Sequence, residues 1–133
     1  MLAVCTVIGL FVCLPLVVAV SLFAHSMCGT IEQYSVHSPD KLHRAVFFSA
    51  SCGATTPNDY GVSVLLAGEP FTDDTEFNVF SVSAGYPASF GMRWKDAETL
   101  EVKFNRRRTE SLARGGVRDL ETHVGSVRVV YVE

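Results

Sequence analysis

Hydrophobic residues form one continuous run at the N-terminus and short, interrupted runs in the rest of the chain. Residues 1–24 carry no charged side chain, and the first formal charge is Glu32. A helix rises about 1.5 Å per residue, so residues 2–24 would extend about 35 Å, enough to cross a hydrocarbon core of about 30 Å. The pattern therefore predicts a transmembrane anchor at residues 1–26, followed by a separate domain at residues 27–133.

Two other interpretations of the apolar run stay open. A cleaved secretory signal has a basic n-region and an apolar stretch of about 7–15 residues. Here the stretch is longer, and no Lys or Arg precedes the small residues Ala24 and Ser26. A lipoprotein signal would place the lipid on Cys28, but Met27 stands where a small residue is expected. An uncleaved anchor needs only length and apolarity, and we adopt that interpretation.

The flanking charges say little about the orientation of this anchor. No basic residue precedes it to hold the N-terminus in the cytoplasm, and Lys41 and Arg44 after it weakly favour the opposite orientation to an exported domain. The cysteines beyond the apolar run, Cys28 and Cys52, favour export because disulfides persist in oxidising compartments. We therefore predict a single-pass membrane protein whose C-terminal domain is extracytoplasmic.

The domain has the pattern of β-strands, with short runs of alternating, β-branched or aromatic residues separated by Gly, Pro and polar turns. Strands are expected at residues 31–37, 42–49, 60–67, 77–84, 90–95, 99–105, 118–124 and 127–132. Residues 106–116 are polar and loop-like, although residues 110–114 could form a helical turn. The pattern predicts an all-β fold, a small antiparallel meander or sandwich of about seven or eight strands.

The hairpin of residues 90–95 and 99–105 has the best-determined register. With residues 96–98 as its loop, three apolar pairs lie opposite each other on one face of the hairpin. They are Trp94 and Leu100, Met92 and Val102, and Phe90 and Phe104. The same register places Arg93 opposite Glu101 on the solvent side. Because both faces agree, the register is strongly indicated, and this hairpin is expected to supply much of the core.

Two further side-chain arrangements follow from the alternation. Val62, Val64 and Leu66 are expected on one face of their strand. Near the end of the chain, Gly125-Ser126 suits a two-residue turn, which would place Val124 opposite Val127, Thr122 opposite Val129 and Leu120 opposite Tyr131.

Size and charge narrow the classes of function. Without the anchor about 105 residues remain, which is one small domain. All charged residues lie in this part, so the net charge of −3 belongs to it. A mildly acidic domain with one short basic run is a poor nucleic-acid binder, so we expect no nucleic-acid partner.

Cys28 and Cys52 are the two cysteines outside the apolar run, and a lone pair in an exported domain is more often a disulfide than two free thiols. Closing a loop of about 25 residues stabilises a fold by roughly 3–4 kcal/mol in the chain-entropy model. The alternative is a nucleophilic Cys52, which would need an activating base. The candidate bases His37, His43 and His123 are in no recognisable catalytic spacing.

Other chemistry has weaker support. Zinc is not expected because no CxxC or HxxxH spacing occurs, and we predict neither a metal nor a cofactor. Asp73, Asp74 and Glu76 could attract calcium, but they lack the glycine and oxygen spacing of a calcium loop, so a solvated acidic loop is favoured. The run at residues 106–108, three arginines, could touch anionic headgroups or a wall polymer, although a solvated strand end is favoured.

Several short motifs resemble a family of bacterial envelope proteins of unknown function. They are Cys28, Ser38-Pro39-Asp40, the CGATT string Cys52-Gly53-Ala54-Thr55-Thr56, Trp94, Leu100-Glu101-Val102 and the ending Val127-x-Val129-x-Tyr131. The resemblance covers residues 28–133, and CGATT is its most specific part. Members have a membrane segment or signal, then a Cys and an SPDGK turn. This chain has Lys41 where the family usually has Gly, which allows a turn of another type.

The resemblance supports the Cys28–Cys52 pairing and an envelope-facing β domain, and it implies no activity. We expect a membrane-anchored, non-catalytic binding or structural module of the bacterial cell envelope, with the membrane and an envelope protein as partners. The alternative is an inhibitor or immunity-type protein acting on an envelope enzyme or toxin, which the small size, disulfide and tether suit. An enzyme that uses Cys52 or the Thr55-Thr56 loop is the third hypothesis.

Overall fold

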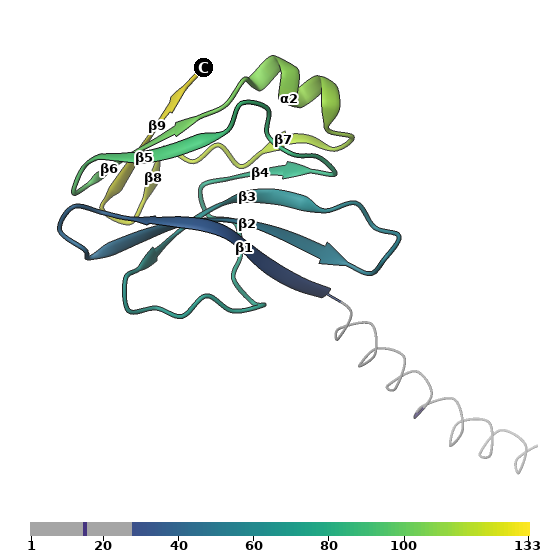
Figure 1. Ribbon diagram of the computed structural model, residues 1–133, viewed down its shortest axis with the longest axis horizontal. Coiled ribbons are helices and arrows are strands. Elements are labelled where there is room, and N and C mark those ends of the chain that lie inside the picture. The colour runs from purple at the N-terminus through teal and green to yellow at the C-terminus, as the bar shows by residue number, and fades with distance from the viewer. Residues whose placement is uncertain (1–14, 16–27) are drawn as a thin grey trace, which may run out of the picture.

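The computed structural model describes Pro15 and residues 28–133, and the latter form two β-sheets and a short helix (Figure 1). The first sheet has the order β1 (Cys28–His37), β2 (His43–Cys52), β3 (Asp59–Leu66), β4 (Phe80–Ser83) and β7 (Gly116–Arg118). The second has the order β5 (Gly91–Asp96), β6 (Thr99–Lys103), β9 (Val127–Val132) and β8 (His123–Val124). The helix is α2 (Arg106–Leu112). The predicted all-β fold is confirmed for this part of the chain.

The predicted anchor at residues 1–26 lies outside the described residues, apart from Pro15. Within the described part of the chain, no helix is both long enough and apolar enough to span a membrane.

The sheets form a sandwich in which the strands are not a simple meander. β6 and β9 run parallel, with Leu100 opposite Val129 and Val102 opposite Tyr131. The expectation of purely antiparallel order is therefore wrong. A meander pairs only strands that follow one another in the sequence. Here β9 pairs with β6, although α2, β7 and β8 lie between them along the chain. This pairing brings two apolar faces together in the layer between the sheets.

β2 is central to the core and is buried on both of its faces. Ala45, Val46, Phe47 and Phe48 have no exposed surface. Phe47 faces the inter-sheet core, where it stacks on Phe90 at a centroid distance of 4.1 Å. The adjacent Phe48 must point the other way, since side chains alternate along a strand.

The outer side of the first sheet is covered by the segment between β3 and β4, residues 67–79. Phe77 of this segment stacks on Phe48 at 4.4 Å and Phe71 meets the same ring edge-on at 5.1 Å. The expected acidic loop is therefore also a hydrophobic cover. Close packing here requires Gly61, because a Cβ at that position would overlap the Phe77 ring and the Phe80 carbonyl oxygen.

The register of the β5–β6 hairpin is as predicted, with Trp94 opposite Leu100, Met92 opposite Val102 and Arg93 opposite Glu101. Leu100 and Val102 are fully buried, and Trp94 packs half-buried against them. The Trp94 indole N–H donates to the carbonyl of Val36 in β1 over 3.0 Å, which links the two sheets at this edge.

Val62, Val64 and Leu66 alternate along β3 as expected; Val62 and Val64 are buried, whereas Leu66 is 62% exposed because it ends the strand and the chain turns there. Two other local expectations are wrong. Val124 does pair with Val127, but β8 begins only at His123. Leu120 is not opposite Tyr131, because the backbone turns at Asp119 with φ 55° and the Glu121 N–H donates to the carbonyl of Val79, the residue before β4.

The second wrong expectation is the loop at residues 106–116. Residues 106–112 form α2, which begins earlier than the helical turn allowed at residues 110–114, and β7 begins at Gly116. Asn105 caps the helix, since its side chain accepts a hydrogen bond from the Arg108 N–H over 2.8 Å. Thr109 is completely buried, and its hydroxyl oxygen accepts the Ala88 N–H over 2.9 Å. The helix is thereby fastened to the chain entering β5.

Candidate functional site

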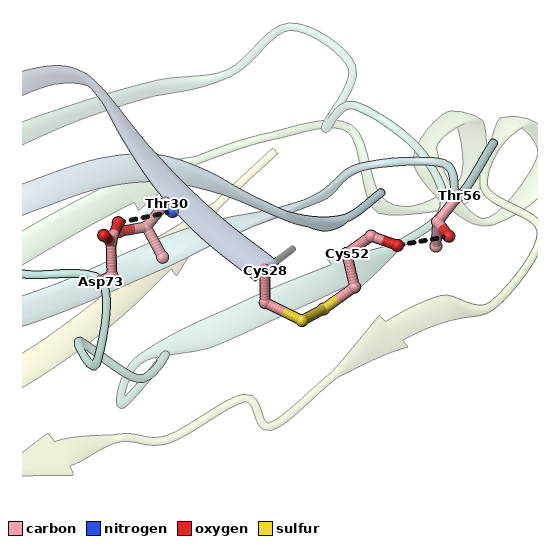
Figure 2. The surroundings of a disulfide bond; sticks show 5 residues. All are labelled: Cys28, Thr30, Cys52, Thr56 and Asp73. Atoms are coloured by element: carbon pink, nitrogen blue, oxygen red, sulfur yellow. Dashed lines mark hydrogen bonds between the residues drawn. A yellow bond between two sulfur atoms is a disulfide. The ribbon is translucent and has the colours of Figure 1, made fainter. Parts of the chain in front are cut away.

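The Cys28–Cys52 disulfide is confirmed, with an S–S distance of 2.10 Å, and it joins the first residue of β1 to the last residue of β2 (Figure 2). The two residues are direct partners in the antiparallel register. A bulge at Gln33 makes this possible, because the pairing from His37 to Tyr34 would, continued without a bulge, place Cys28 opposite Gly53. The bulge therefore aligns the sulfur atoms.

The CGATT string forms the turn that follows the disulfide. Gly53 has φ 96°, a conformation that other residues rarely adopt. The Thr56 hydroxyl donates to the Cys52 carbonyl over 2.8 Å, and the Thr56 N–H donates to the Gly53 carbonyl over 3.3 Å. Ala54 and Thr55 are exposed. The motif thus folds back on its own backbone and holds Cys52 in place.

A second contact fixes β1 beside the disulfide. Asp73, in the covering segment 67–79, accepts hydrogen bonds from the backbone N–H of Thr30 at 3.1 Å and from its hydroxyl at 3.3 Å (Figure 2). Asp73 therefore occupies part of the outer edge of β1, where an added strand would otherwise pair. From the sequence, Asp73 is recognisable only as an acidic loop residue, because no neighbouring residue indicates Thr30 as its partner.

An open hollow lies between the disulfide, the CGATT turn and the covering segment. Four carboxylates line it, from Asp59, Asp73, Asp74 and Glu76. Asp59 accepts the Ala84 N–H over 2.8 Å, so this carboxylate, like that of Asp73, is used in holding backbone. Among the described residues, no group of three or more His, Cys, Asp or Glu side chains is arranged to hold a metal ion. The hollow is therefore an acidic surface in which two of the four carboxylates hold backbone.

The structure brings none of the candidate bases to Cys52. His43 and Cys52 are the first and last residues of β2, which places them about 30 Å apart along the strand. His43 instead stacks on Trp94 at a centroid distance of 6.2 Å. His37 ends β1 at the far end from the disulfide, and His123 is in the second sheet. With its sulfur in the disulfide, Cys52 is no free nucleophile.

The three arginines of residues 106–108 form the first turn of α2 and are exposed. Arg106 pairs with Glu110 over 2.9 Å, one helical turn later. The run is therefore a solvated helix start rather than a strand end.

Comparisons of the chain with protein-family models, with curated proteins and with solved structures returned no match. The resemblance carried by CGATT and the SPD turn stays a prediction.

Proposed function

We propose that the protein is a membrane-anchored, non-catalytic binding or structural module of the bacterial cell envelope. Residues 1–26 form a single transmembrane span, and residues 27–133 form a domain outside the cytoplasm. The observation that carries this proposal is the disulfide at the point where β1 begins, which only residues 25–27 separate from the apolar run.

The disulfide supports a location outside the cytoplasm and a firm attachment of the domain to its membrane tether. Structural disulfides persist in oxidising compartments and are rare in the cytosol. At this position, the bond fastens the segment next to the span to β2, whose central residues are buried on both faces. A pull on the tether would reach the core strand directly, rather than peeling the edge strand β1 from the sheet.

The use of the motif residues supports a function without catalysis. Both sulfur atoms are joined, and the Thr56 hydroxyl is hydrogen-bonded to the Cys52 carbonyl. These groups hold the end of the hairpin. Such a role explains the CGATT string without a reaction.

The SPD turn supports membership of the envelope family suggested by the resemblance. Lys41, which replaces the family's usual Gly, has φ 59°, and its N–H donates to the Ser38 carbonyl over 2.9 Å. The backbone therefore takes the left-handed conformation that favours glycine, although the side chain is Lys. A different residue here does not require a different turn.

Thiol labelling combined with membrane fractionation tests the proposal. In a Cys5→Ala/Cys13→Ala background, Cys28 and Cys52 are the remaining cysteines. We expect the protein in the carbonate-resistant membrane fraction, with no maleimide-polyethylene glycol added under denaturing, non-reducing conditions and two groups added after reduction. Cys28→Ser in the same background is the control, because its single thiol must react without reductant.

The protein recovered in the soluble cytosolic fraction with both thiols reactive would contradict the proposal. A protein in the membrane fraction with both thiols reactive would refute the extracytoplasmic location of the domain.

A further inference from the structure

The outer side of the second sheet carries a cluster of cations, which we call the basic face. The register places on one side Gly91, Arg93 and Asp96 of β5, Thr99, Glu101 and Lys103 of β6, His123 of β8, and Arg128, Val130 and Val132 of β9. Lys95, at the irregularity in β5, reaches the same side through its contact with Glu101. Arg93, Lys95, Lys103 and Arg128 are exposed. They make up four of the eleven Lys and Arg residues of a chain whose net charge is −3.

Of the two carboxylates within this face, Glu101 is paired with cations. Glu101 lies on the central strand β6 with its side chain only 11% exposed, 2.7 Å from the Arg93 Nε and 4.0 Å from the Lys95 Nζ. The hydrogen bond from Arg93 holds the pKa of the Glu101 carboxyl below its usual range, so the carboxyl is ionised at neutral pH. Asp96, opposite Thr99, accepts the Glu98 N–H in the β5–β6 turn; this hydrogen bond, with a smaller contribution from the charge of Arg128, lowers the pKa of its carboxyl. Glu133 follows β9 and lines the hollow described below.

Glu101 also orients Arg93. The guanidinium binds Glu101 through Nε, and within residues 28–133 its two terminal nitrogens have no hydrogen-bond partner. Lys103 and Arg128 form no ion pair with any described carboxylate. A guanidinium held through Nε presents its remaining donors as a fork, the geometry that recognises a phosphate with two hydrogen bonds.

Two of these cations, Arg93 and Lys103, lie beside an open hollow of about 580 Å³. It is lined by Gly91, Met92, Arg93, Glu101, Lys103, Val132 and Glu133. Gly91 keeps it open, since it stands opposite Lys103 without a side chain, and a Cβ added there would meet no atom within 4 Å. The face therefore has a place for a phosphate between Arg93 and Lys103.

We propose that the basic face binds the backbone of a phosphate-bearing anionic polymer of the cell envelope. This inference rests on the proposed function, because it names the partner class of an envelope module. Charge complementarity argues for a polyanion. Cations two residues apart on one strand are spaced by about 7 Å, so an extended polymer can contact several at once.

The arrangement favours such a polymer over lipid. The basic face points away from the first sheet, whose edge strand β1 begins at Cys28 and lies in the other layer (Figure 1). Only residues 25–27 separate Cys28 from the apolar run, so an anchored domain has its Cys28 end at the lipid surface. The tether therefore joins the layer opposite the basic face.

The arrangement also favours a polymer without bases. The positions of the basic face include no Phe, Tyr or Trp on which a base could stack. Recognition is therefore expected to depend on phosphate charge.

The three lysines of the chain provide a direct test, since Lys95 and Lys103 lie on the basic face and Lys41 lies in the β1–β2 turn. Full-length protein in nonionic detergent is acylated with an amine reagent, with and without inorganic polyphosphate, and modified sites are quantified by mass spectrometry. We expect acylation of Lys103 to slow at least threefold and that of Lys95 to slow less, because Lys95 already faces Glu101. Lys41 should be unchanged. Unchanged rates at all three, or equal slowing at all three, would overturn the proposal.

Variants of the same full-length protein separate the hollow from general charge. Lys103→Gln should weaken polyphosphate binding about fivefold and lower the salt slope by about one. Gly91→Leu, which fills the hollow and keeps every charge, should weaken binding at least threefold. Glu133→Gln should strengthen binding.

The matched control is Arg118→Gln, which removes an exposed cation on β7 of the first sheet and should change the affinity less than twofold. Equal losses for Lys103→Gln and Arg118→Gln, or wild-type binding by Gly91→Leu at an unchanged melting temperature, would overturn the assignment.

Two further arms exclude other partners. In nanodiscs without polyphosphate, protection of Lys95 and Lys103 by phosphatidylglycerol but not phosphatidylcholine would show that the face rests on lipid, and would overturn the proposal. Tighter binding of an oligothymidylate than of polyphosphate of equal charge would do the same in favour of nucleic acid. If the protein fractionates with membranes but polyphosphate does not slow acylation of Lys103, only the proposed polymer binding is rejected. If the protein does not fractionate with membranes, the proposed anchor is rejected.

Discussion

Removing the disulfide should destabilise the β domain by a predictable amount. The perturbation is the double variant Cys28→Ser/Cys52→Ser, which leaves no unpaired thiol at the site. The bond spans a sequence separation of 24 residues. Restoring the freedom of a loop of this length to the unfolded chain costs about 3.5 kcal/mol in the chain-entropy model.

The folded state should change little in this variant. The two cysteines are already opposite each other in the β1–β2 register, and Asp73 still holds Thr30 at the same end of β1. Most of the loss should therefore arise in the unfolded chain, and the variant should keep the native fold with a free energy of unfolding lower by about 2–4 kcal/mol.

Trp94 provides the assay, since it is the one tryptophan in the sequence and its indole N–H donates to Val36 of β1. Urea unfolding followed by its fluorescence should show a midpoint lower by roughly 1–3 M, given urea slopes of roughly 1–3 kcal/mol per M for small domains. Reduced wild type should unfold with the variant's midpoint, and reductant should leave the variant unchanged. A variant midpoint within about 0.3 M of oxidised wild type would refute the reasoning.

The remaining predictions use the same unfolding assay. Gly61→Ala should cost about 1–3 kcal/mol, because its Cβ meets packed backbone, whereas Gly91→Ala should be within about 0.5 kcal/mol of wild type; equal effects would contradict the packing argument. Lys41→Gly should raise the free energy of unfolding by roughly 0.5–1 kcal/mol, because glycine adopts the left-handed backbone at φ 59° without strain. A lower free energy of unfolding in this variant would contradict the expected strain at Lys41. Tyr131→Phe should remove a hydroxyl that donates to the Val79 and Glu121 carbonyls, at about 1 kcal/mol near pH 7. Burial raises the Tyr131 pKa above its unfolded value near 10, so wild type should lose this stability as the pH rises above about 10, and the Phe variant should lose less over that interval.

The parts of the fold predicted correctly depend on local pattern. The β5–β6 register follows from alternation on both sides of a short turn, and Trp94 opposite Leu100 is its direct consequence. The Val124–Val127 pair follows in the same way from the two-residue turn between them. In these cases, the residues that determine the pairing are within ten positions of each other along the chain.

The parts predicted wrongly depend on contacts between distant segments. Phe71 and Phe77 lie in a segment rich in polar and acidic residues, and nothing near them indicates that Phe48 needs a cover on its outer side. The burial of Phe48 and Phe47 on opposite faces becomes intelligible only when both layers are present. Alternation identifies the two faces of a strand, but it does not show which of them the rest of the chain will cover.

The two candidate sites differ in the same respect. The disulfide could be predicted because two cysteines leave one pairing, although the bulge at Gln33 that aligns them left no clear signal. The basic face could not be predicted, because its cations are single residues scattered over positions 93–128. The conspicuous basic run, residues 106–108, lies in α2 and is not part of this face. It is the parallel pairing of β6 with β9 that brings Arg128 beside Thr99 and into the same surface as Lys103. Disrupting that pairing should therefore disperse the cations without altering the net charge, so polyanion binding should follow the integrity of the second sheet rather than the composition of the chain.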